Sequence, residues 1–249
     1  MTVFDLALWQ LALIAVTALG AQVVGGLAGY GTGLLMPLVL VPLIGPEAIV
    51  PVISLSSILT NITRVAVFRE SLDIRKALLV TAFALPTTLI GAYFYTQLSS
   101  QGAATVIGSM LIALVPLRRY LARAKFTLGP KGGAAAGVVY GFLTGGTTGV
   151  GVILLSIFLS MGLTGLQVIS TDALTSSILG IAKTGVFVWA GALPAKLWLV
   201  AILIGAMATP GTMLARWLSQ KFSAKVHDML IEATIMVGGL MLVSRAITD

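Results

Sequence analysis

Long apolar stretches separated by short polar ones run along almost the whole chain. Several are shorter than the roughly 20 residues that a helix needs to cross a bilayer. We predict about ten membrane segments, some of them short, broken or re-entrant, at about residues 5–28, 33–45, 48–68, 73–96, 101–120, 132–144, 149–161, 166–190, 195–217 and 225–246. This pattern leaves no room for a separate soluble domain. We therefore expect residues 1–249 to form a single all-α integral membrane domain.

The composition agrees with a lipid environment. Of the 249 residues, 58% are hydrophobic and only 9% are charged, and the mean hydropathy is +1.06. A soluble domain carries about 25% charged residues, so this chain lacks the polar material to cover a water-facing surface. The first apolar stretch lacks the positively charged start of a signal peptide, and we predict that it is a retained helix.

The net charge of +7 is best explained by basic cytoplasmic loops, in which membrane proteins collect Lys and Arg. No basic run is interleaved with aromatic residues, so we expect no nucleic-acid partner. The chain contains no cysteine, which removes disulfides, thiolate metal sites and cysteine nucleophiles. Its one histidine, His227, has no second histidine for a metal pair. We expect neither a metal nor a cofactor, and no enzymatic activity.

Short sequences recur at a nearly constant offset, which indicates two copies of one unit of about 120 residues. The first of these sequences is a series of glycines four residues apart, the glycine ladder: Gly25, Gly29 and Gly33 match Gly141, Gly145 and Gly149. "VIS" then recurs at 52–54 and 168–170, and "SSIL" at 56–59 and 176–179. We assign the copies to residues 1–120 and 132–249, joined by a basic linker at 118–131.

The charged loops predict that the second copy is inverted. In the first copy the loop near 69–76 is basic and the loop near 97–101 is uncharged. In the second copy the loop at 191–196 carries only Lys196, and the basic loop is at 216–227. Five segments per copy would move the basic loop in this way, and inverted repeats recur in secondary transporters. The linker then lies in the cytoplasm and both termini lie outside.

The glycine-rich turns should lie inside the membrane. The segment 132–144 reaches only about 20 Å at 1.5 Å per residue, whereas the hydrocarbon core is about 30 Å thick. Broken backbone at that depth survives only when it is buried in protein or lines a wet cavity. Close helix packing by small residues is the alternative explanation for part of the ladder, namely Gly25, Gly133, Gly137 and Gly141.

Two such turns, aimed at one central point by inverted copies, would form a pocket for a small anion. A helix N-terminus carries about half a positive charge and free N–H donors, and threonine hydroxyls add further donors. The predicted binding residues in the turns are Gly31, Thr32, Gly33, Thr147, Thr148 and Gly149.

Ionisable residues within the apolar segments each need a reason, because a charge at the bilayer centre costs at least about 2.5 kcal/mol. We predict that Arg64 and Lys183 flank the pocket and attract the anion, with Asn61 on the same helix face as Arg64. Snorkelling to the interface is the alternative for Arg64. Asp172 and Glu232 are candidates for proton coupling, or for partners of basic residues.

The stretch "GGLAGYGTGLLMPLVL" followed by "ISLSSILTN" resembles the TauE/SafE family of sulfite and organosulfonate transporters. The resemblance covers essentially the whole chain, but it is carried by glycine and proline spacing. It implies a multi-pass protein of the bacterial or archaeal cytoplasmic membrane that moves sulfur oxyanions, often outward.

The combined expectation is a secondary transporter that moves a small sulfur-containing anion by alternating access. Three alternatives stay open: an anion channel, a carboxylate transporter of the same fold, and a membrane assembly subunit without transport activity. The expected partners are the anion and the lipid bilayer, and a homodimer is compatible with the free glycine faces.

Overall fold

The chain folds almost entirely into helices. The computed structural model describes residues 2–3, 6–28, 32–123 and 127–219. The α-helices are α1 (Leu8–Ala28), α2 (Thr32–Ile44), α3 (Ile49–Phe68), α4 (Ile74–Thr96), α5 (Ser100–Arg123), α6 (Pro130–Gly146), α7 (Gly151–Ser160), α8 (Leu166–Trp189), α9 (Ala195–Ala206) and α10 (Ala208–Ser219). Two 3₁₀ turns, η1 (Pro46–Ala48) and η2 (Arg69–Ser71), flank α3, and a strand pair, β1 (Thr2–Val3) with β2 (Leu6–Ala7), precedes α1.

Nine of the predicted segments correspond to helices, with differences at their ends. The predicted segment 195–217 is two helices, α9 and α10, which separate at Met207. Pro210 explains this break, because it has no N–H to donate to the carbonyl of Ala206 four residues earlier. Helix α6 extends the predicted segment 132–144 by two residues at each end, and α7 is shorter than 149–161. The tenth segment, 225–246, lies outside the described residues.

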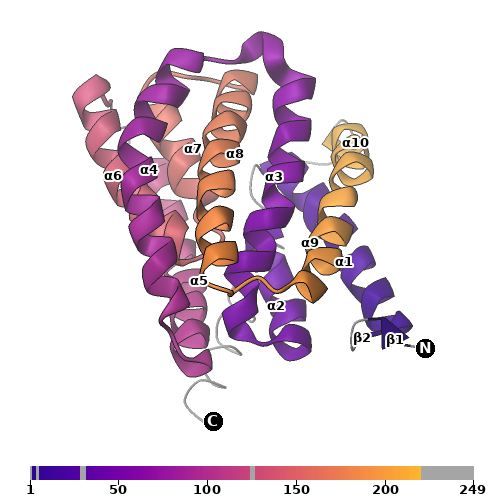
Figure 1. Cartoon of the computed structure of the whole chain (residues 1–249). Coiled ribbons are helices and arrows are strands. Elements are labelled where there is room, and N and C mark those ends of the chain that lie inside the picture. The colour runs from indigo at the N-terminus through magenta and orange to yellow at the C-terminus, as the bar shows by residue number, and fades with distance from the viewer. Residues whose placement is uncertain (1, 4–5, 29–31, 124–126, 220–249) are drawn as a thin grey trace.

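Within the described part of the chain, three helical stretches are long and apolar enough to cross a membrane: Pro46–Ser71, Ile74–Thr96 and Ala195–Leu214. Shorter apolar helices lie at Leu8–Val23, Leu35–Ile44, Ser100–Leu114 and Gly151–Ser160. The first residues of α1 and α9 and the end of α8 carry exposed tryptophans, and these helix ends lie at the lower end of Figure 1. Tryptophans gather at membrane interfaces, so Trp9, Trp189 and Trp198 mark one edge of the apolar belt.

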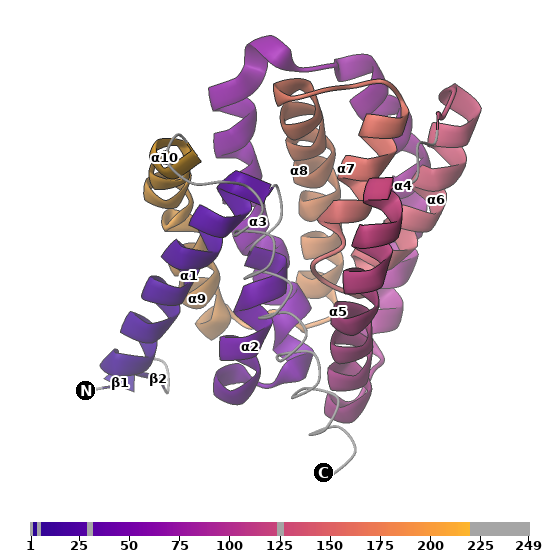
Figure 2. The same ribbon diagram turned by 180° about the vertical axis from the view of Figure 1, so that it is seen from behind.

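Helices α3 and α8 form the centre of the molecule, with α4 and α6 on one side and α1, α9 and α10 on the other (Figures 1 and 2). The packing is reciprocal between the two predicted repeats. Helix α8 packs on α4, which packs on α6, and α3 packs on α9, which with α10 packs on α1. The connection 69–73 after α3 and the connection 161–165 before α8 lie at the same end of the molecule (Figure 1). Helices α3 and α8 therefore run in opposite directions.

Apolar side chains gather in two clusters. One joins α1, α2, α3, α5 and α9, with Ile14, Leu40, Ile49, Ile107 and Ile204 at 0% exposure, and it extends to α4 and α8 through Tyr95 and Phe187. The other joins α4, α6, α7 and α8 and includes Val80, Leu154 and Phe158. The first cluster therefore crosses the central pair, and α4 contributes to both clusters.

Glycines on one face of α6 let its backbone approach α4 closely. A Cβ atom added to Gly137 would lie 3.0 Å from the carbonyl oxygen of Val80, and Cβ atoms on Gly141 and Gly145 would collide with the carbonyls of Ala84 and Thr88. The packing explanation therefore holds for Gly137 and Gly141.

Gly133, at the start of α6, faces a side chain instead of the α4 backbone. A Cβ atom there would lie 2.7 Å from the sulfur of Met161. Gly25, which the packing explanation also covered, belongs to the part of α1 whose side-chain environment is outside the described residues.

Replacing Gly141 tests this packing. We expect Gly141→Ala to lower the apparent melting temperature in detergent, because forcing a methyl group into a filled contact costs about 1–3 kcal/mol. The control is Gly185→Ala on α8, where an added Cβ meets nothing within 4 Å and alanine favours the helix. Equal melting temperatures for the two variants would contradict the assigned contact.

Candidate functional site

The glycine-rich turn of the second repeat is a real interruption of the helix. Helix α6 ends at Gly146 and α7 begins at Gly151, with Thr147 in an extended conformation (φ −152°, ψ −174°). Gly149 has a φ of +84°, which only glycine adopts at no steric cost. The 10 residues of α7 span about 15 Å, which is half the thickness of a hydrocarbon core.

The start of α2 contacts the turn between α6 and α7. The hydroxyl of Thr148 donates a hydrogen bond to the carbonyl oxygen of Gly33 over 3.0 Å. A Cβ atom on Gly33 would lie 2.7 Å from the backbone nitrogen of Gly149, so the two backbones meet where neither has a side chain. The carbonyl of Gly33 is available because Pro37, four residues on in α2, has no N–H to donate to it.

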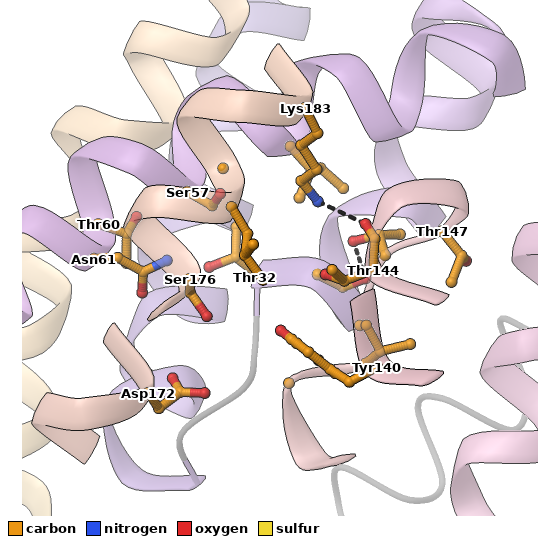
Figure 3. A pocket seen from close by; sticks show the side chains of 18 of the residues that line it. Thr32, Ser57, Thr60, Asn61, Tyr140, Thr144, Thr147, Asp172, Ser176 and Lys183 are labelled. Atoms are coloured by element: carbon orange, nitrogen blue, oxygen red, sulfur yellow. Dashed lines mark hydrogen bonds between the residues drawn. The ribbon is translucent and has the colours of Figure 1, made fainter. Parts of the chain in front are cut away.

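A polar cavity of about 120 Å³ lies beside this contact, between α2, α3, α6, α7 and α8 (Figure 3). Most of its polar lining comes from hydroxyl groups and from the backbone of the start of α2 and of the turn between α6 and α7. The residues that line it are Thr32, Gly33, Ile53, Ser57, Thr60, Asn61, Arg64, Tyr140, Thr144, Thr147, Thr148, Gly149, Val150, Gly151, Asp172, Ser176, Leu179, Gly180 and Lys183.

Three charged side chains line the cavity and are almost fully buried. Arg64, Asp172 and Lys183 are exposed to only 7%, 4% and 8%. Arg64 therefore faces the interior, and its snorkelling alternative does not describe this structure. The Arg64 guanidinium on α3 and the Asp172 carboxylate on α8 attract each other electrostatically. Lys183 and Asp172 lie at different ends of the pocket, with Ser176 and Thr32 between them in the view of Figure 3.

Lys183 stabilises the end of α6. Its ammonium group donates a hydrogen bond to the carbonyl oxygen of Thr144 over 2.9 Å, where the helix is about to end and its carbonyls lack partners. A cation at a helix C-terminus is favourable. An ammonium group has three N–H donors, so this bond leaves donor capacity for a ligand in the cavity.

Two polar atoms of the lining have no protein hydrogen-bond partner: the Oδ1 atom of Asp172 and the Oγ1 atom of Thr147. Both side chains are buried, at 4% exposure each. Leaving a buried polar atom unsatisfied costs about 1–3 kcal/mol. Such atoms beside an open cavity are therefore suited to contact what enters it.

The structure brings together nearly all of the predicted site residues. Thr32, Gly33, Asn61, Arg64, Thr147, Thr148, Gly149, Asp172 and Lys183 line the one cavity. Gly31 and Glu232 lie outside the described residues. The hydroxyl of Thr148 differs from the expectation that it serves as an anion donor, because in this structure its proton is used by Gly33.

Sequence reasoning missed Tyr140 and Thr144, which line the cavity from α6. The Tyr140 hydroxyl lies within hydrogen-bonding reach of the side chains of Thr144 and Ser176. Comparing the two copies could not reveal Tyr140 and Thr144, because the first copy has Val24 and Ala28 at the corresponding positions. A usable signal was present, since Tyr140 and Thr144 are four residues apart and therefore share a helix face.

A second missed feature is Thr60, whose hydroxyl is held in place from α1. It accepts a hydrogen bond from the Gln22 side chain over 3.0 Å and donates one to the carbonyl of Ser56. Ser57 likewise donates to the backbone of its own helix, at Ser54. These two hydroxyls shape the wall more than they offer protons to a ligand.

Comparison with known proteins gives one family. The model of the family described as "Sulfite exporter TauE/SafE" matches residues 13–242, nearly the whole chain. No significant match was found among curated proteins or among solved structures.

The contact between the start of α2 and the turn after α6 can be tested at Thr148. We expect Thr148→Val to lower the free energy of unfolding by about 0.5–1.5 kcal/mol, because it removes the hydrogen bond to the partly buried carbonyl of Gly33. Thr148→Ser keeps the hydroxyl and should lie close to the original protein in thermal unfolding in detergent.

Thr105→Val is the matched control, since the hydroxyl of Thr105 is exposed and bonds only its own helix, at Gln101. A Thr148→Val protein as stable as the Thr105→Val protein would show that the hydrogen bond contributes nothing.

Proposed function

The chain belongs to the TauE/SafE sulfite exporter family, and from this premise we propose that sulfite or an organosulfonate crosses the membrane through the cavity between α3 and α8. Membership makes the protein a multi-pass membrane transporter of the sulfite-exporter type and not an enzyme. The further steps are which groups hold the anion, how it crosses, and which way the protein faces.

The observation that carries the proposal is the convergence of positive charge on one buried cavity. Arg64 and Lys183 line it, and so do the first residues of α2 and α7, whose N-termini carry partial positive charge and unpaired N–H groups. No side chain caps the N-terminus of α7. A sulfur oxyanion offers several acceptor oxygens, which charged N–H donors match well.

Within the cavity, the anion is held at the end that contains Lys183. Lys183 has N–H donors there beside the one that bonds Thr144, and the unpartnered hydroxyl of Thr147 and the backbone at Gly151 also line the cavity. Asn61 and Arg64 extend the donor set along α3. Sulfite and small organosulfonates are compact anions, and a cavity of about 120 Å³ suits a small ligand, since pockets for drug-sized ligands measure about 300–1,000 Å³.

Crossing proceeds by alternating access, with the two repeats as inverted halves. This is supported by the reciprocal packing and by the opposite directions of α3 and α8. Each half would move as a unit about the central pair, exposing the cavity first to one side and then to the other.

The protein sits in the cytoplasmic membrane of a bacterial or archaeal cell with its basic end inward. The upper end of Figure 1 has η2 with Arg69 and the first turns of α4 and α6 with Arg75, Lys76 and Lys131, whereas the lower end has the first turn of α9 with Lys196. Cytoplasmic loops carry the excess of Lys and Arg, so the end with four basic residues faces the cytoplasm.

Removing either buried cation should impair transport. We expect Arg64→Ala and Lys183→Ala to reduce counterflow of a labelled sulfonate in proteoliposomes at least about tenfold. Each variant removes a charged donor to the anion, and a hydrogen bond to a charged group contributes about 1.5–3 kcal/mol. Arg75→Ala and Lys131→Ala, at exposed positions of the basic end, are the matched controls.

Unchanged counterflow in both cavity variants would remove them from the binding site. Saturable counterflow identifies a carrier, whereas ohmic currents without counterflow would identify an anion channel instead.

The orientation can be tested with single cysteines, since the chain has none of its own. Gly129→Cys lies at the basic end and Ala190→Cys at the opposite end, and both positions are exposed. We expect a membrane-impermeant maleimide to label Ala190→Cys in intact cells and Gly129→Cys only after permeabilisation. The reverse pattern would invert the proposed topology.

A further inference from the structure

We propose that Asp172 sets the charge of the anion that is carried: singly charged anions cross alone, and doubly charged anions cross together with a proton on Asp172. This inference rests on the proposed function, since it concerns the same cavity and the same transported anions. It adds to that function a rule for substrate charge and for proton coupling.

The first step is the charge of the empty cavity. Among the described residues, its lining contains two cations, Arg64 and Lys183, and one anion, Asp172. With all three ionised, the cavity carries a net single positive charge. One singly charged anion therefore neutralises it, and a doubly charged anion leaves one uncompensated negative charge.

The second step is the cost of that excess charge. An unbalanced charge within a membrane costs at least about 2.5 kcal/mol, and all three charged groups are withdrawn from water, with exposures below 10%. We therefore expect the protein to change conformation when the cavity with its bound anion is neutral overall. A proton from the solvent that reaches the cavity restores neutrality when the anion is doubly charged.

The third step is the identity of the group that takes the proton. Asp172 lines the cavity, and its Oδ1 atom has no hydrogen-bond donor among the described residues. Burial away from water opposes its ionised form, and attraction to Arg64 partly offsets this. A doubly charged anion that binds Arg64 would compete with the Asp172 carboxylate for this attraction. Binding of the anion would therefore favour protonation of Asp172.

Among the described residues, no other titratable group in the surroundings of Asp172 fills this role. Arg64 faces it from α3 and Tyr140 from α6, and α7 has no titratable residue. Lys183 lies on α8 itself, three turns away. Near the start of α4, Asp73 caps that helix by accepting from the Lys76 N–H, and its own N–H donates to Thr171.

The experiment uses the purified full chain in proteoliposomes, with methanesulfonate as the singly charged anion and sulfate as the doubly charged one. For the original protein we expect sulfate uptake to rise as the medium is made more acid and to carry protons inward, as read by an entrapped pH dye. Methanesulfonate uptake should move no protons and should not depend on pH.

Asp172→Asn should remove the proton requirement. This substitution removes the one negative charge of the lining, so the net charge of the empty cavity rises by one and matches a doubly charged anion. We therefore expect the ratio of sulfate to methanesulfonate uptake to rise at least about tenfold and the pH dependence of sulfate uptake to disappear. Asp172→Glu keeps the carboxylate and should keep the coupling. Glu70→Gln, at an exposed loop position, is the control for loss of an acidic group elsewhere.

The outcomes separate this inference from the proposed function. If the original protein carries neither anion and neither raises its melting temperature, the proposed function fails. If methanesulfonate is carried but sulfate moves no protons, the charge rule alone is overturned, and this test needs no variant to fold. An Asp172→Asn protein that keeps the original ratio and pH dependence would overturn it as well.

Discussion

The rest of the structure depends on one constraint: hydrocarbon offers no hydrogen bonds to a helix that ends inside it. Helix α6 ends and α7 begins within the packed helices, so their free N–H and C=O groups must find protein partners or an aqueous cavity. The Thr148–Gly33 hydrogen bond and the Lys183–Thr144 hydrogen bond supply two of these partners. The remaining unpaired groups at the helix N-termini face the cavity, which makes it attractive to an anion.

The same constraint explains why the chemistry of the site is concentrated on α3 and α8. These central helices are shielded from lipid by the outer ones, so they can carry Arg64, Asp172 and Lys183. The free-energy cost of withdrawing these charges from water is reduced by the attraction between them and by the polar cavity that they line. Helix α8 has 24 residues, yet it is not among the stretches apolar enough to count as membrane spans. Its polar residues mark it as the wall of the cavity.

The two predicted repeats differ in chemistry at corresponding positions of the sequence. Thr32 and Thr148 are equivalent in the glycine ladder, yet Pro37 frees a carbonyl in the first copy, whereas Ile153 at the equivalent place has its own N–H. Arg64 likewise corresponds to Thr184 by the repeat offset. These departures from the repeat pattern give the cavity its charge distribution.

The sequence alone determined the helical class, most helix positions, the family resemblance and the charged residues of the cavity lining, because apolar periodicity, glycine content and the rarity of intramembrane charge are local properties. Only the tertiary structure decided that Arg64 points inward beside Asp172, that Thr148 uses its proton on Gly33, and that Tyr140 joins the lining. These facts depend on which helix faces come together across more than 100 residues of chain. Spacing along a sequence restricts such contacts, but the direction of a side chain is set by packing against its neighbours.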